Sequence, residues 1–422
     1  MDKKIIKRQL FDQIKAHVSH KEITLVVGPR QVGKTTLLKL VEEDLRQEGK
    51  KTLFLNLDVE SDRAHVISQE ALVQYIRLSF GEERGYVFID EAQRKEDAGR
   101  FFKGIYDMDL PYKLLLSGSG SLELKEKIHE SMAGRKRVFE LLPVTFEEFA
   151  AFRTDYRYND RLMDFFRTSE IETNSLLNEY LQFGGYPGVI LCASAKEKLQ
   201  LLVEIYQSYL VRDISFLLGV EKTDAFTHLV RLLASTIGNL VSVSELSSTL
   251  GISAQTVKKY LWYLEQTYII ARVSPYFRNA RTELSKMPVY YFSDLGLRNL
   301  SAHVASETVE SDGFLFENFV FSILRERFGL ASNPIHFWRS KGGAEVDFVL
   351  QAGAKLIPIE VKSRSGKNIA MSRSLTSFIH QYRPERAFIV TKNHQAQFVV
   401  GDTPVEAVPF YELLEKNFIG GS

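Results

Sequence analysis

Short apolar runs alternate with amphipathic stretches between residues 20 and 145. Four runs have strand length: 23–27 (ITLVV), 52–57 (TLFLNL), 86–90 (YVFID) and 113–118 (KLLLSG). The stretches between them, such as 35–47 (TTLLKLVEEDLRQ), repeat apolar residues at helical spacing. Strands that are apolar throughout and alternate with helices are typical of a parallel sheet that is covered on both faces. The pattern therefore predicts an α/β domain over residues 1–145.

The rest of the chain divides into three predicted regions and a connecting segment. Residues 146–224 have mostly helical periodicity, with a break at FGGYPG. Residues 225–277 contain short helices followed by β-branched residues, and residues 313–422 mix helices with strands. The stretch 278–312 is the least periodic, and we expect a linker there.

Composition and charge narrow the class of protein. The 422 residues are enough for about three domains. Hydrophobic residues make up 45% and charged residues 25%, which excludes a largely disordered or fibrous chain. Because 54 Lys and Arg residues nearly balance 53 Asp and Glu residues, a surface that binds nucleic acid has to be a local patch.

The single cysteine and the absence of long apolar runs bear on location. Cys192 cannot form an internal disulfide or a multi-cysteine zinc site, so we expect a reducing compartment and a packing role for this residue. The charged N-terminal stretch lacks the apolar core of a signal peptide, and no apolar run approaches membrane-spanning length. We therefore expect a cytoplasmic protein that does not contact a membrane.

A phosphate-binding loop is the clearest chemical signal. Residues 28–35 (GPRQVGKT) match the G-x-x-x-x-G-K-[ST] motif, follow an apolar run and open a helix. In such a loop, main-chain N–H groups and the helix N-terminus surround a phosphate, Lys34 bridges the β- and γ-phosphates, and Thr35 binds Mg²⁺. The residues expected to hold the nucleotide are Gly28, Pro29, Arg30, Gln31, Val32, Gly33, Lys34, Thr35 and Thr36.

Asp90 ends the run 86–90, about 55 residues after the loop, and Glu91 follows it directly. Asp90 at the carboxyl end of a parallel strand would lie beside the loop and hold Mg²⁺ through water. Glu91 would polarise the attacking water as a general base. Ser117 ends the next strand and could orient that water. The alternative is a surface acidic pair that merely ends a strand.

Arg135 directly follows a predicted helix (SLELKEKIHESMA) that ends at Gly134. Two interpretations stay open for its guanidinium. It could reach the γ-phosphate bound by a neighbouring subunit, which would require a homo-oligomer. It could instead be a cation that stabilises the C-terminus of the helix.

GPRQVGKT, FIDEAQ, LLLSGSGS, AGRKRVFELLPVTFEEF and FGGYPG, in this order, resemble prokaryotic AAA+-type P-loop ATPases. Proteins of this family carry a C-terminal restriction-endonuclease-like domain that is usually described as a domain of unknown function. The resemblance implies an additional-strand ATPase core, ATP and Mg²⁺ as cofactors, Asp90 as the Mg²⁺ aspartate and Glu91 as the catalytic glutamate.

The resemblance also suggests roles outside the core. Gly184, Gly185 and Pro187 resemble the Gly-x-Pro feature through which a helical lid touches the nucleotide, although a plain turn between helices has the same composition. Arg8-Gln9 resembles the family's N-terminal segment beside the adenine. Arg212 is the best candidate for a second sensor arginine.

Residues 242–273 have the layout of a winged helix. Ser244 and Ser253 could cap two helices, and Gly251 would permit the tight turn between them. The second helix has a core stripe and an opposite face that carries the lysines of a recognition helix. The stripe comprises Val257, Leu261 and Leu264, and the other face Thr256, Lys258, Lys259 and Tyr263. Either DNA contact or a rigid docking role fits this pattern.

A nuclease-like set follows in the C-terminal region. Glu360 and Lys362 are two residues apart and therefore share one face of a strand, and Asp347 lies on a neighbouring strand. The two carboxylates could share Mg²⁺ or Mn²⁺, with Lys362 polarising water and Glu317 completing the cluster. The set resembles the PD-(D/E)xK nucleases. A solvated surface with a structural Glu–Lys pair is the alternative.

Local charge favours a polyanion near this set. Residues 317–400 contain 12 Lys and Arg residues but six Asp and Glu residues. A basic rim around carboxylates suits a phosphodiester substrate. The flanking basic residues are Arg339, Lys341, Arg364, Lys367 and Arg373.

Two functions remain open from the sequence. The first is a Mg²⁺-dependent ATPase that binds DNA and couples its nucleotide state to a nuclease-like domain. The second is an ATP-dependent regulatory switch in which the nuclease-like domain is a catalytically silent docking module.

Overall fold

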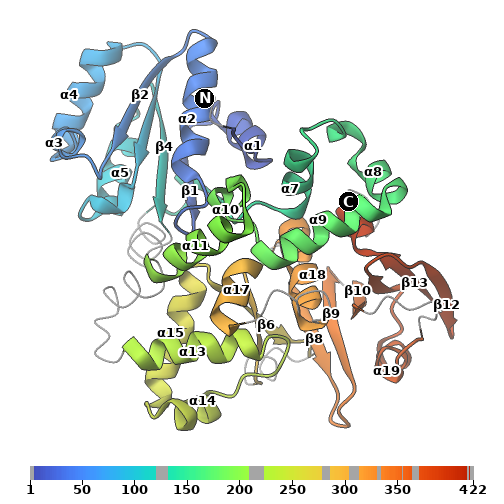
Figure 1. Cartoon of the computed structure of the whole chain (residues 1–422). Helices are drawn as coiled ribbons and strands as arrows, with labels where there is room; N and C mark the ends of the chain where they lie inside the picture. Colours follow the sequence, from blue (N-terminus) through green and yellow to red (C-terminus); the bar gives the residue numbers. More distant parts are fainter. Residues whose placement is uncertain are drawn as a thin grey trace. The chain divides into compact units, whose positions relative to one another are not determined.

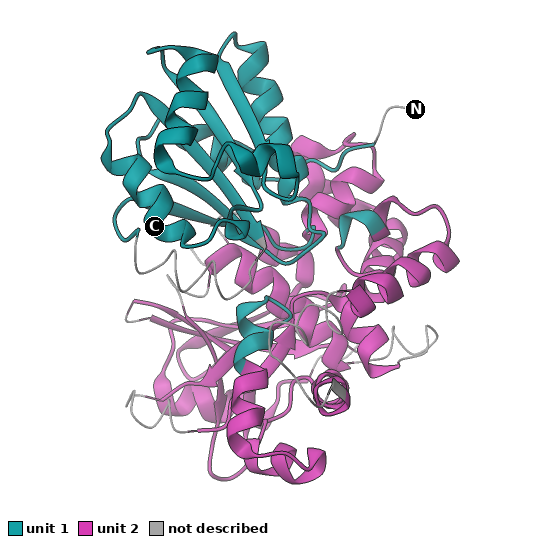
Figure 2. Ribbon diagram, turned by 90° about the vertical axis from the view of Figure 1, so that its left-hand side faces the viewer, with its two compact units in different colours: residues 1–144, 186–188, 262–269 teal, residues 145–185, 189–261, 270–422 magenta. Residues whose placement is uncertain are grey.

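The computed structural model (Figure 1) describes residues 4–119, 132–208, 223–277, 286–303, 313–329, 334–353, 355–363, 370–415 and 418. The chain forms two compact units (Figure 2). Unit 1 comprises Met1–Val144, Tyr186–Gly188 and Trp262–Ile269. Unit 2 comprises Thr145–Gly185, Val189–Leu261 and Ile270–Ser422. The three regions expected after residue 145 thus fall mainly into a single unit.

Unit 1 is built on a five-stranded parallel sheet with the order β2-β3-β4-β1-β5. Each of the four apolar runs forms a strand, as predicted. Because β4 lies between β1 and β3, the sheet has the additional-strand arrangement. The strands are β1 (Ile23–Gly28), β2 (Lys51–Asn56), β3 (Gly85–Asp90), β4 (Tyr112–Ser119) and β5 (Lys136–Glu140).

Alternate residues of the strands face opposite sides of the sheet, and both sides are buried. Ile23, Leu25 and Val27 of β1 pack in one apolar cluster with residues of α4 and α5. Val26 of the same strand and Phe88 of β3 are also fully buried. The helices of unit 1 are α1 (Leu10–His17), α2 (Lys34–Gln47), α3 (Glu60–Ala64), α4 (Gln69–Phe80), the 3₁₀ turn η1 (Ala92–Arg94) and α5 (Ala98–Asp107).

The first part of unit 2 is helical, as predicted. Its apolar residues include Phe146, which packs against Tyr180 and also against Phe319 and Phe410 from the C-terminal region. The elements are α7 (Phe146–Arg153), η2 (Asn159–Arg161), α8 (Leu162–Thr168), α9 (Glu170–Phe183), α10 (Pro187–Leu191) and α11 (Ala195–Ile205). Arg212 lies outside the described residues.

Three helices follow, α13 (Thr223–Ser235), α14 (Val243–Leu250) and α15 (Ala254–Gln266), and a tight turn at Gly251 joins the last two. Ser253 accepts a hydrogen bond from the Thr256 N–H at 3.1 Å, which confirms it as the cap of α15. The cap of α14 is Ser242 and not Ser244, because the helix begins two residues earlier and the Glu245 N–H reaches the Ser242 hydroxyl. Gly251 has φ +62°, the left-handed conformation that the turn requires.

The buried stripe of α15 is as predicted, whereas on the other face Thr256 and Tyr263 are half-buried. Val257, Leu261 and Leu264 are buried, whereas Lys258 and Lys259 are exposed. After α15, β6 (Ile270–Pro275) pairs antiparallel with β7 (Val289–Phe292), which supplies a hairpin.

The expected linker over 278–312 is wrong for its described part. This part contains β7 and α17 (Leu295–Ala302), and Tyr291 and Phe292 are almost completely buried. The strand has four residues, too few for an alternating pattern to show, and its pairing with β6 decides its conformation. Residues 278–285 and 304–312 lie outside the described residues.

An eight-stranded mixed sheet has the order β12-β13-β11-β10-β9-β8-β6-β7. β8, β9 and β10 are antiparallel neighbours, whereas β11 lies parallel to β10. β6 pairs parallel with β8, so the hairpin after α15 extends the C-terminal sheet. The elements are α18 (Gly313–Phe328), β8 (Ile335–Arg339), β9 (Glu345–Ala352), β10 (Lys355–Lys362), α19 (Arg373–Tyr382), β11 (Ala387–Thr391), β12 (Ala396–Val400), β13 (Thr403–Pro409) and η5 (Phe410–Leu414).

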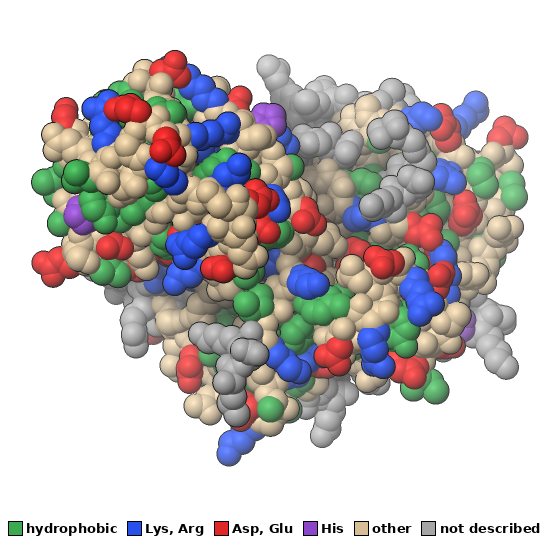
Figure 3. Space-filling model, turned by 90° about the horizontal axis from the view of Figure 1, so that it is seen from above, with side chains coloured by type: hydrophobic (Ala, Val, Ile, Leu, Met, Phe, Trp, Pro, Cys, Tyr) green, Lys and Arg blue, Asp and Glu red, His purple; other side chains and the backbone are tan. Residues whose placement is uncertain are grey.

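Acidic and basic side chains are interspersed on the face of the molecule that Figure 3 shows, in keeping with the balanced charge. Among the described residues, no helix combines the length and the apolar character that crossing a bilayer requires.

Candidate functional site

The phosphate loop connects β1 to α2, the strand and helix that the motif requires. Gly28 has φ +157°, and a Cβ at this position would lie 2.0 Å from the Leu141 carbonyl oxygen. Gly33 has φ +94° and is the N-cap of α2. Close main-chain packing at Gly28 and a left-handed backbone at Gly33 therefore explain both glycines of the motif.

Lys34 is turned into the loop. Its Nζ donates to the carbonyl oxygens of Gly28 at 3.1 Å and Pro29 at 2.6 Å, and the residue is 6% exposed. Burial lowers the pKa of Lys34 to about 8, although the nearby carboxylates of Glu91 and Asp90 favour its charged form. The ammonium group thus stands at the position where a phosphate could replace two carbonyl partners.

Thr35, Asp90 and Ser117 meet at the carboxyl ends of the central strands. The Thr35 hydroxyl donates to Oδ2 of Asp90 at 2.7 Å, and the Ser117 hydroxyl donates to Oδ1 of the same residue. Asp90 ends β3, and the pairing of β3 with β4 places Ser117 beside it. A hydroxyl and a carboxylate are hard oxygen ligands, so Thr35 and Asp90 fit Mg²⁺.

Glu91 follows Asp90 with a left-handed backbone, φ +54°. This conformation is rare for a residue other than glycine and turns the chain sharply where β3 ends. The half-buried Glu91 carboxylate accepts a hydrogen bond from the amide of Gln93. Gln93 was not identified from the sequence, although it lies in FIDEAQ.

Arg135 does not belong to the site of its own chain. The register pairs Ile23 with Lys136, so Arg135 lies where β1 begins, whereas the phosphate loop starts where β1 ends, about 20 Å away along the strand. Its guanidinium forms an ion pair with Asp107 at 2.7 Å. Most of the helix expected before Gly134 lies outside the described residues, which omit 120–131.

FGGYPG forms the turn between α9 and α10. In unit 1, an ideal Cβ on Gly33 would lie 4.0 Å from Cγ of Pro187, so this proline lies next to the phosphate loop. In unit 2, the Gly185 N–H donates to Oδ2 of Asp294 at 2.7 Å, and a Cβ on Gly184 would lie 2.4 Å from the same oxygen. The segment is thus a turn between helices, and its Pro187 is a neighbour of the loop within unit 1.

Asp294 was not identified from the sequence because it lies in the expected linker. It is the N-cap of α17 and accepts from the Leu297 N–H at 2.8 Å. Burial raises the pKa of Asp294 to about 6, against the opposing effect of the backbone N–H groups of Leu297, Gly185 and Gly296.

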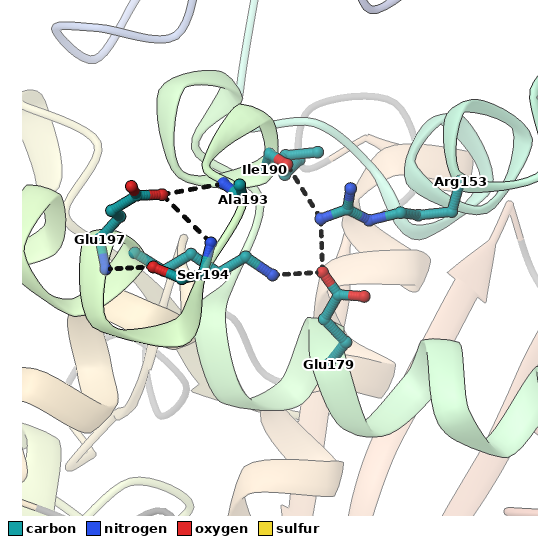
Figure 4. A network of polar contacts seen from close by, with 7 residues as sticks. Arg153, Glu179, Ile190, Ala193, Ser194 and Glu197 are labelled. Carbon is teal, nitrogen blue, oxygen red and sulfur yellow. Dashed lines mark hydrogen bonds and ion pairs between the residues drawn. The ribbon is translucent and has the colours of Figure 1, made fainter.

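A second polar network holds the helices around this turn (Figure 4). Glu179 accepts from Nη2 of Arg153 and from Nζ of Lys198, and Arg153 also donates to the Ile190 carbonyl oxygen at 2.9 Å. Ser194 and Glu197 form a capping box at the start of α11. The network joins α7, α9, α10 and α11 within unit 2.

Arg8 lies beside the loop. Its Nη1 donates to the Val32 carbonyl oxygen at 3.0 Å, and its Nη2 donates to the carbonyl oxygens of Leu142 at 2.7 Å and Pro143 at 3.3 Å. The resemblance placed Arg8-Gln9 beside an adenine, but these contacts join the Arg8 guanidinium to main chain.

Residues 20–150 match the family model of an AAA domain. The match covers the phosphate loop, Asp90, Glu91 and Ser117. Together with the five-stranded sheet it supports a P-loop ATPase. Residues 174–308 and 312–413 match two models that are each described as a domain of unknown function (DUF8612 and DUF4143).

Similar proteins are known in bacteria and archaea. An uncharacterized protein of Mycobacterium tuberculosis is 27% identical over 421 residues, which cover 98% of this chain and 86% of the relative. An uncharacterized protein of Methanocaldococcus jannaschii is 25% identical, over 78% of this chain and 72% of the relative. The crystal structure of Cdc6p from Pyrobaculum aerophilum is 11% identical, over 76% of this chain and 96% of that chain, with a TM-score of 0.32.

The two carboxylates of the predicted nuclease-like set, Asp347 and Glu360, lie on neighbouring strands, as expected. Asp347 is on β9, and Glu360 and Lys362 are on β10, which is antiparallel to β9. Nζ of Lys362 lies 2.5 Å from Oε1 of Glu360, so the two side chains share a face. Asp347 accepts from the Val361 N–H at 2.6 Å. Burial, aided by the charge of Glu360, raises the pKa of the Asp347 carboxyl group.

Glu317 has a different partner. Its Oε1 accepts from the Tyr291 hydroxyl at 2.6 Å. The structure, within its described residues, contains no group of three or more His, Cys, Asp or Glu side chains placed to hold a metal ion. Within the described residues, Glu317 therefore does not complete an acidic cluster with Asp347 and Glu360.

Two neighbours of this set were not identified from the sequence. Tyr291 is on β7, in the expected linker, where VYYF gives no sign of a polar role. Ser372 donates to Oε2 of Glu360 at 2.6 Å and also caps α19.

The expected basic rim is seen only in part. Arg339 lies 3.7 Å from Glu345, and Lys341 and Arg373 are exposed. Arg364 and Lys367 lie outside the described residues.

Proposed function

We propose that this protein is a Mg²⁺-dependent ATPase. The observation that carries the proposal is the meeting of Thr35, Asp90 and Ser117 beside the buried Lys34. These side chains come from α2, β3 and β4, so a local motif alone does not explain their meeting. Mg²⁺, when bound with ATP, would neutralise charge on the β- and γ-phosphates.

The protein's own residues have separate tasks in this proposal. Lys34 exchanges its two carbonyl partners for phosphate oxygens and stabilises the charge that develops during transfer. Glu91 accepts a proton from the attacking water. Ser117 orients that water or the Asp90 carboxylate. Thr35 and Asp90 are the candidate ligands of Mg²⁺.

Binding and turnover of ATP, measured separately on two variants, test the assignment. Lys34→Ala should weaken ATP binding and abolish turnover, because the phosphates lose their cation. Glu91→Gln should bind ATP normally and hydrolyse it about 10²- to 10⁴-fold more slowly, because only the base is lost. Hydrolysis by Glu91→Gln at the wild-type rate would show that another group is the base.

We further propose that unit 2 binds DNA and is a metal-dependent nuclease-like module. Support comes from the succession α18-β8-β9-β10-α19-β11 and from the close grouping of Glu360 with Lys362 on one strand face. Two exposed lysines of α15 offer a second DNA contact. The bond between Glu317 and Tyr291 favours the alternative, a silent docking module in a regulatory switch.

A salt titration of DNA affinity tests DNA binding. A cleavage assay, with ATP turnover measured beside it, separates the nuclease-like module from the docking alternative and from the ATPase proposal. Each phosphate contact that Lys341→Ala or Lys258→Ala removes should reduce the slope of log affinity against log salt by about 0.9. Glu360→Ala should abolish cleavage in Mg²⁺ or Mn²⁺ and leave ATP turnover unchanged. If the wild type binds DNA but cuts no DNA substrate, the docking alternative holds.

We also propose that Arg135 acts across a subunit interface, which would require a homo-oligomer. Its ion pair with Asp107 favours the alternative, a structural cation. Mixing Arg135→Ala with Lys34→Ala subunits should restore some ATP turnover, because one interface then holds both intact halves. If no mixing ratio restores activity while both variants are folded, the shared site is wrong.

A further inference from the structure

The phosphate loop turns some of its carbonyl oxygens outward. A loop that directs N–H groups at a phosphate leaves carbonyl oxygens on its outer side, and these need partners of their own. The Val32 carbonyl oxygen has such a partner in Nη1 of Arg8, at 3.0 Å. Val32 itself is fully buried, so a carbonyl that lost this donor would be poorly compensated.

The same guanidinium reaches the segment that follows β5. Nη2 of Arg8 donates to the carbonyl oxygens of Leu142 and Pro143. Leu141, one residue earlier, touches the start of the loop: its N–H donates to the Val27 carbonyl oxygen at 2.8 Å, and its own carbonyl oxygen packs against Gly28. The segment 141–143 therefore holds the loop directly at Gly28 and, through Arg8, at Val32.

We propose that Arg8 is a positioning residue that holds the phosphate loop in its binding conformation by bridging Val32 to residues 142–143. The proposal rests on the proposed nucleotide-binding function of unit 1. Arg8 itself need not touch the nucleotide, because its donors already face three main-chain oxygens. A loop fixed before binding loses less conformational freedom when a phosphate arrives.

Arginine suits this position for a geometric reason. Its planar guanidinium presents two separate N–H edges at once, whereas a lysine ammonium group is a compact point charge on a flexible stem. Arg8→Lys therefore keeps the charge and loses the bridge. This variant separates positioning from simple attraction of a phosphate by a nearby cation.

Two ligands separate positioning from contact with the adenine. ATP and inorganic tripolyphosphate would both bind the loop through their phosphates, but only ATP carries an adenine. We expect Arg8→Gln and Arg8→Lys to weaken both ligands by the same factor, about ten- to a hundredfold, because hydrogen bonds to a charged group are lost.

The matched control is Arg84→Gln. Arg84 also donates to a main-chain carbonyl, that of Ser19 at 3.1 Å, but it precedes β3 at the opposite end of the strands from the phosphate loop. Its loss should leave the affinity for both ligands unchanged. Thermal melting of every variant confirms that it is folded.

A second measurement needs no ligand. Hydrogen exchange of the nucleotide-free protein should be faster in residues 29–35 of Arg8→Gln and Arg8→Lys than in the wild type, and unchanged there in Arg84→Gln. If the wild type binds neither ligand, the proposed function fails, while this measurement still decides the role of Arg8. Unchanged exchange in residues 29–35 overturns the proposal.

Three binding results also overturn it. A loss of affinity confined to ATP would show that Arg8 contacts the adenine. Full rescue by lysine would leave only a charge effect. Unchanged affinity for both ligands in Arg8→Gln would show that the loop does not need the bridge.

Discussion

The two polar sites of the molecule hold their lysines in opposite ways. Lys34 is buried and donates to two neutral carbonyl oxygens, while Asp90 nearby is occupied by two hydroxyls. The side chain of Lys362 is 42% exposed and is paired directly with Glu360. Lys34 thus forms no ion pair among the described residues, although the carboxylates of Glu91 and Asp90 lie near enough to favour its charged form. Lys362 is already neutralised, so a substrate or metal ion would have to compete with an existing ion pair.

The largest expected effect is the difference in ATP turnover between a variant of the phosphate loop and a variant of the C-terminal site. Lys34→Ala should lower ATP turnover by a hundredfold or more, as about this much is lost with one transition-state donor. Glu360→Ala should leave turnover unchanged, because the two sites lie in different units. ATPase assays on both purified variants check this. A comparable loss in both would mean that the two sites cannot be treated separately.

The next largest expected effect is the difference in stability between two glycine-to-alanine variants, one in each unit. Gly28→Ala places a Cβ against the Leu141 carbonyl oxygen in a strained backbone, so the free energy of unfolding of unit 1 should fall by about 2 to 5 kcal/mol. Gly342→Ala, in the turn between β8 and β9, meets nothing closer than the Ser340 hydroxyl at 3.8 Å and should change stability by about 0.5 kcal/mol or less. Chemical denaturation measures both, and equal stabilities would contradict the packing at Gly28.

The pH dependence of ATP binding tests whether the Lys34 ammonium group gains a partner from the phosphates, unlike Lys362, which already has one. The pKa of Lys34 is about 8 in the nucleotide-free protein, and phosphate oxygens should raise it on binding. A group whose pKa rises on binding takes up a proton, so affinity should fall as pH rises above about 8, by up to tenfold per pH unit. Fluorescence titrations in the alkaline range test this, and Glu360→Gln should give the same profile. A flat profile would show that the Lys34 ammonium does not gain from the phosphates.

The smallest expected effect concerns the hydroxyl that holds Glu317. Tyr291→Phe removes one buried hydrogen bond and should lower the free energy of unfolding of unit 2 by about 1 to 2 kcal/mol. Tyr260→Phe is the control, since its ring is also buried and packs edge-on against Phe226. Denaturation curves that coincide for the two variants would argue against a supporting role for Tyr291.

How far the sequence predicts each site depends on how its residues are connected. Gly28 to Thr35 are contiguous, Asp90 ends β3, and Ser117 lies two residues before the end of β4. The apolar pattern marks both strands, so the whole constellation could be predicted. The pairing of Glu360 with Lys362 followed from the two-residue period of a strand. Local pattern was sufficient in both cases.

The residues that were missed depend on pairing between distant segments. Tyr291 reaches Glu317 only because a four-residue strand pairs with β6, and Asp294 reaches Gly185 across 109 positions of the chain. Arg8 meets Leu142 across 134 positions. Nothing in the local pattern around these residues shows which main-chain group they will meet.

The pairing of β6 with β8 has a consequence for how the chain can be divided. Two family matches meet between residues 308 and 312, yet one ladder of hydrogen bonds crosses that boundary, joining Ser274 and Pro275 to His336 and Phe337. A fragment that begins at residue 313 would lose two strands and present β8 as a bare edge, which another copy could pair with. The hairpin of β6 and β7 and the C-terminal sheet, which lie in one unit, should therefore melt together as one cooperative block.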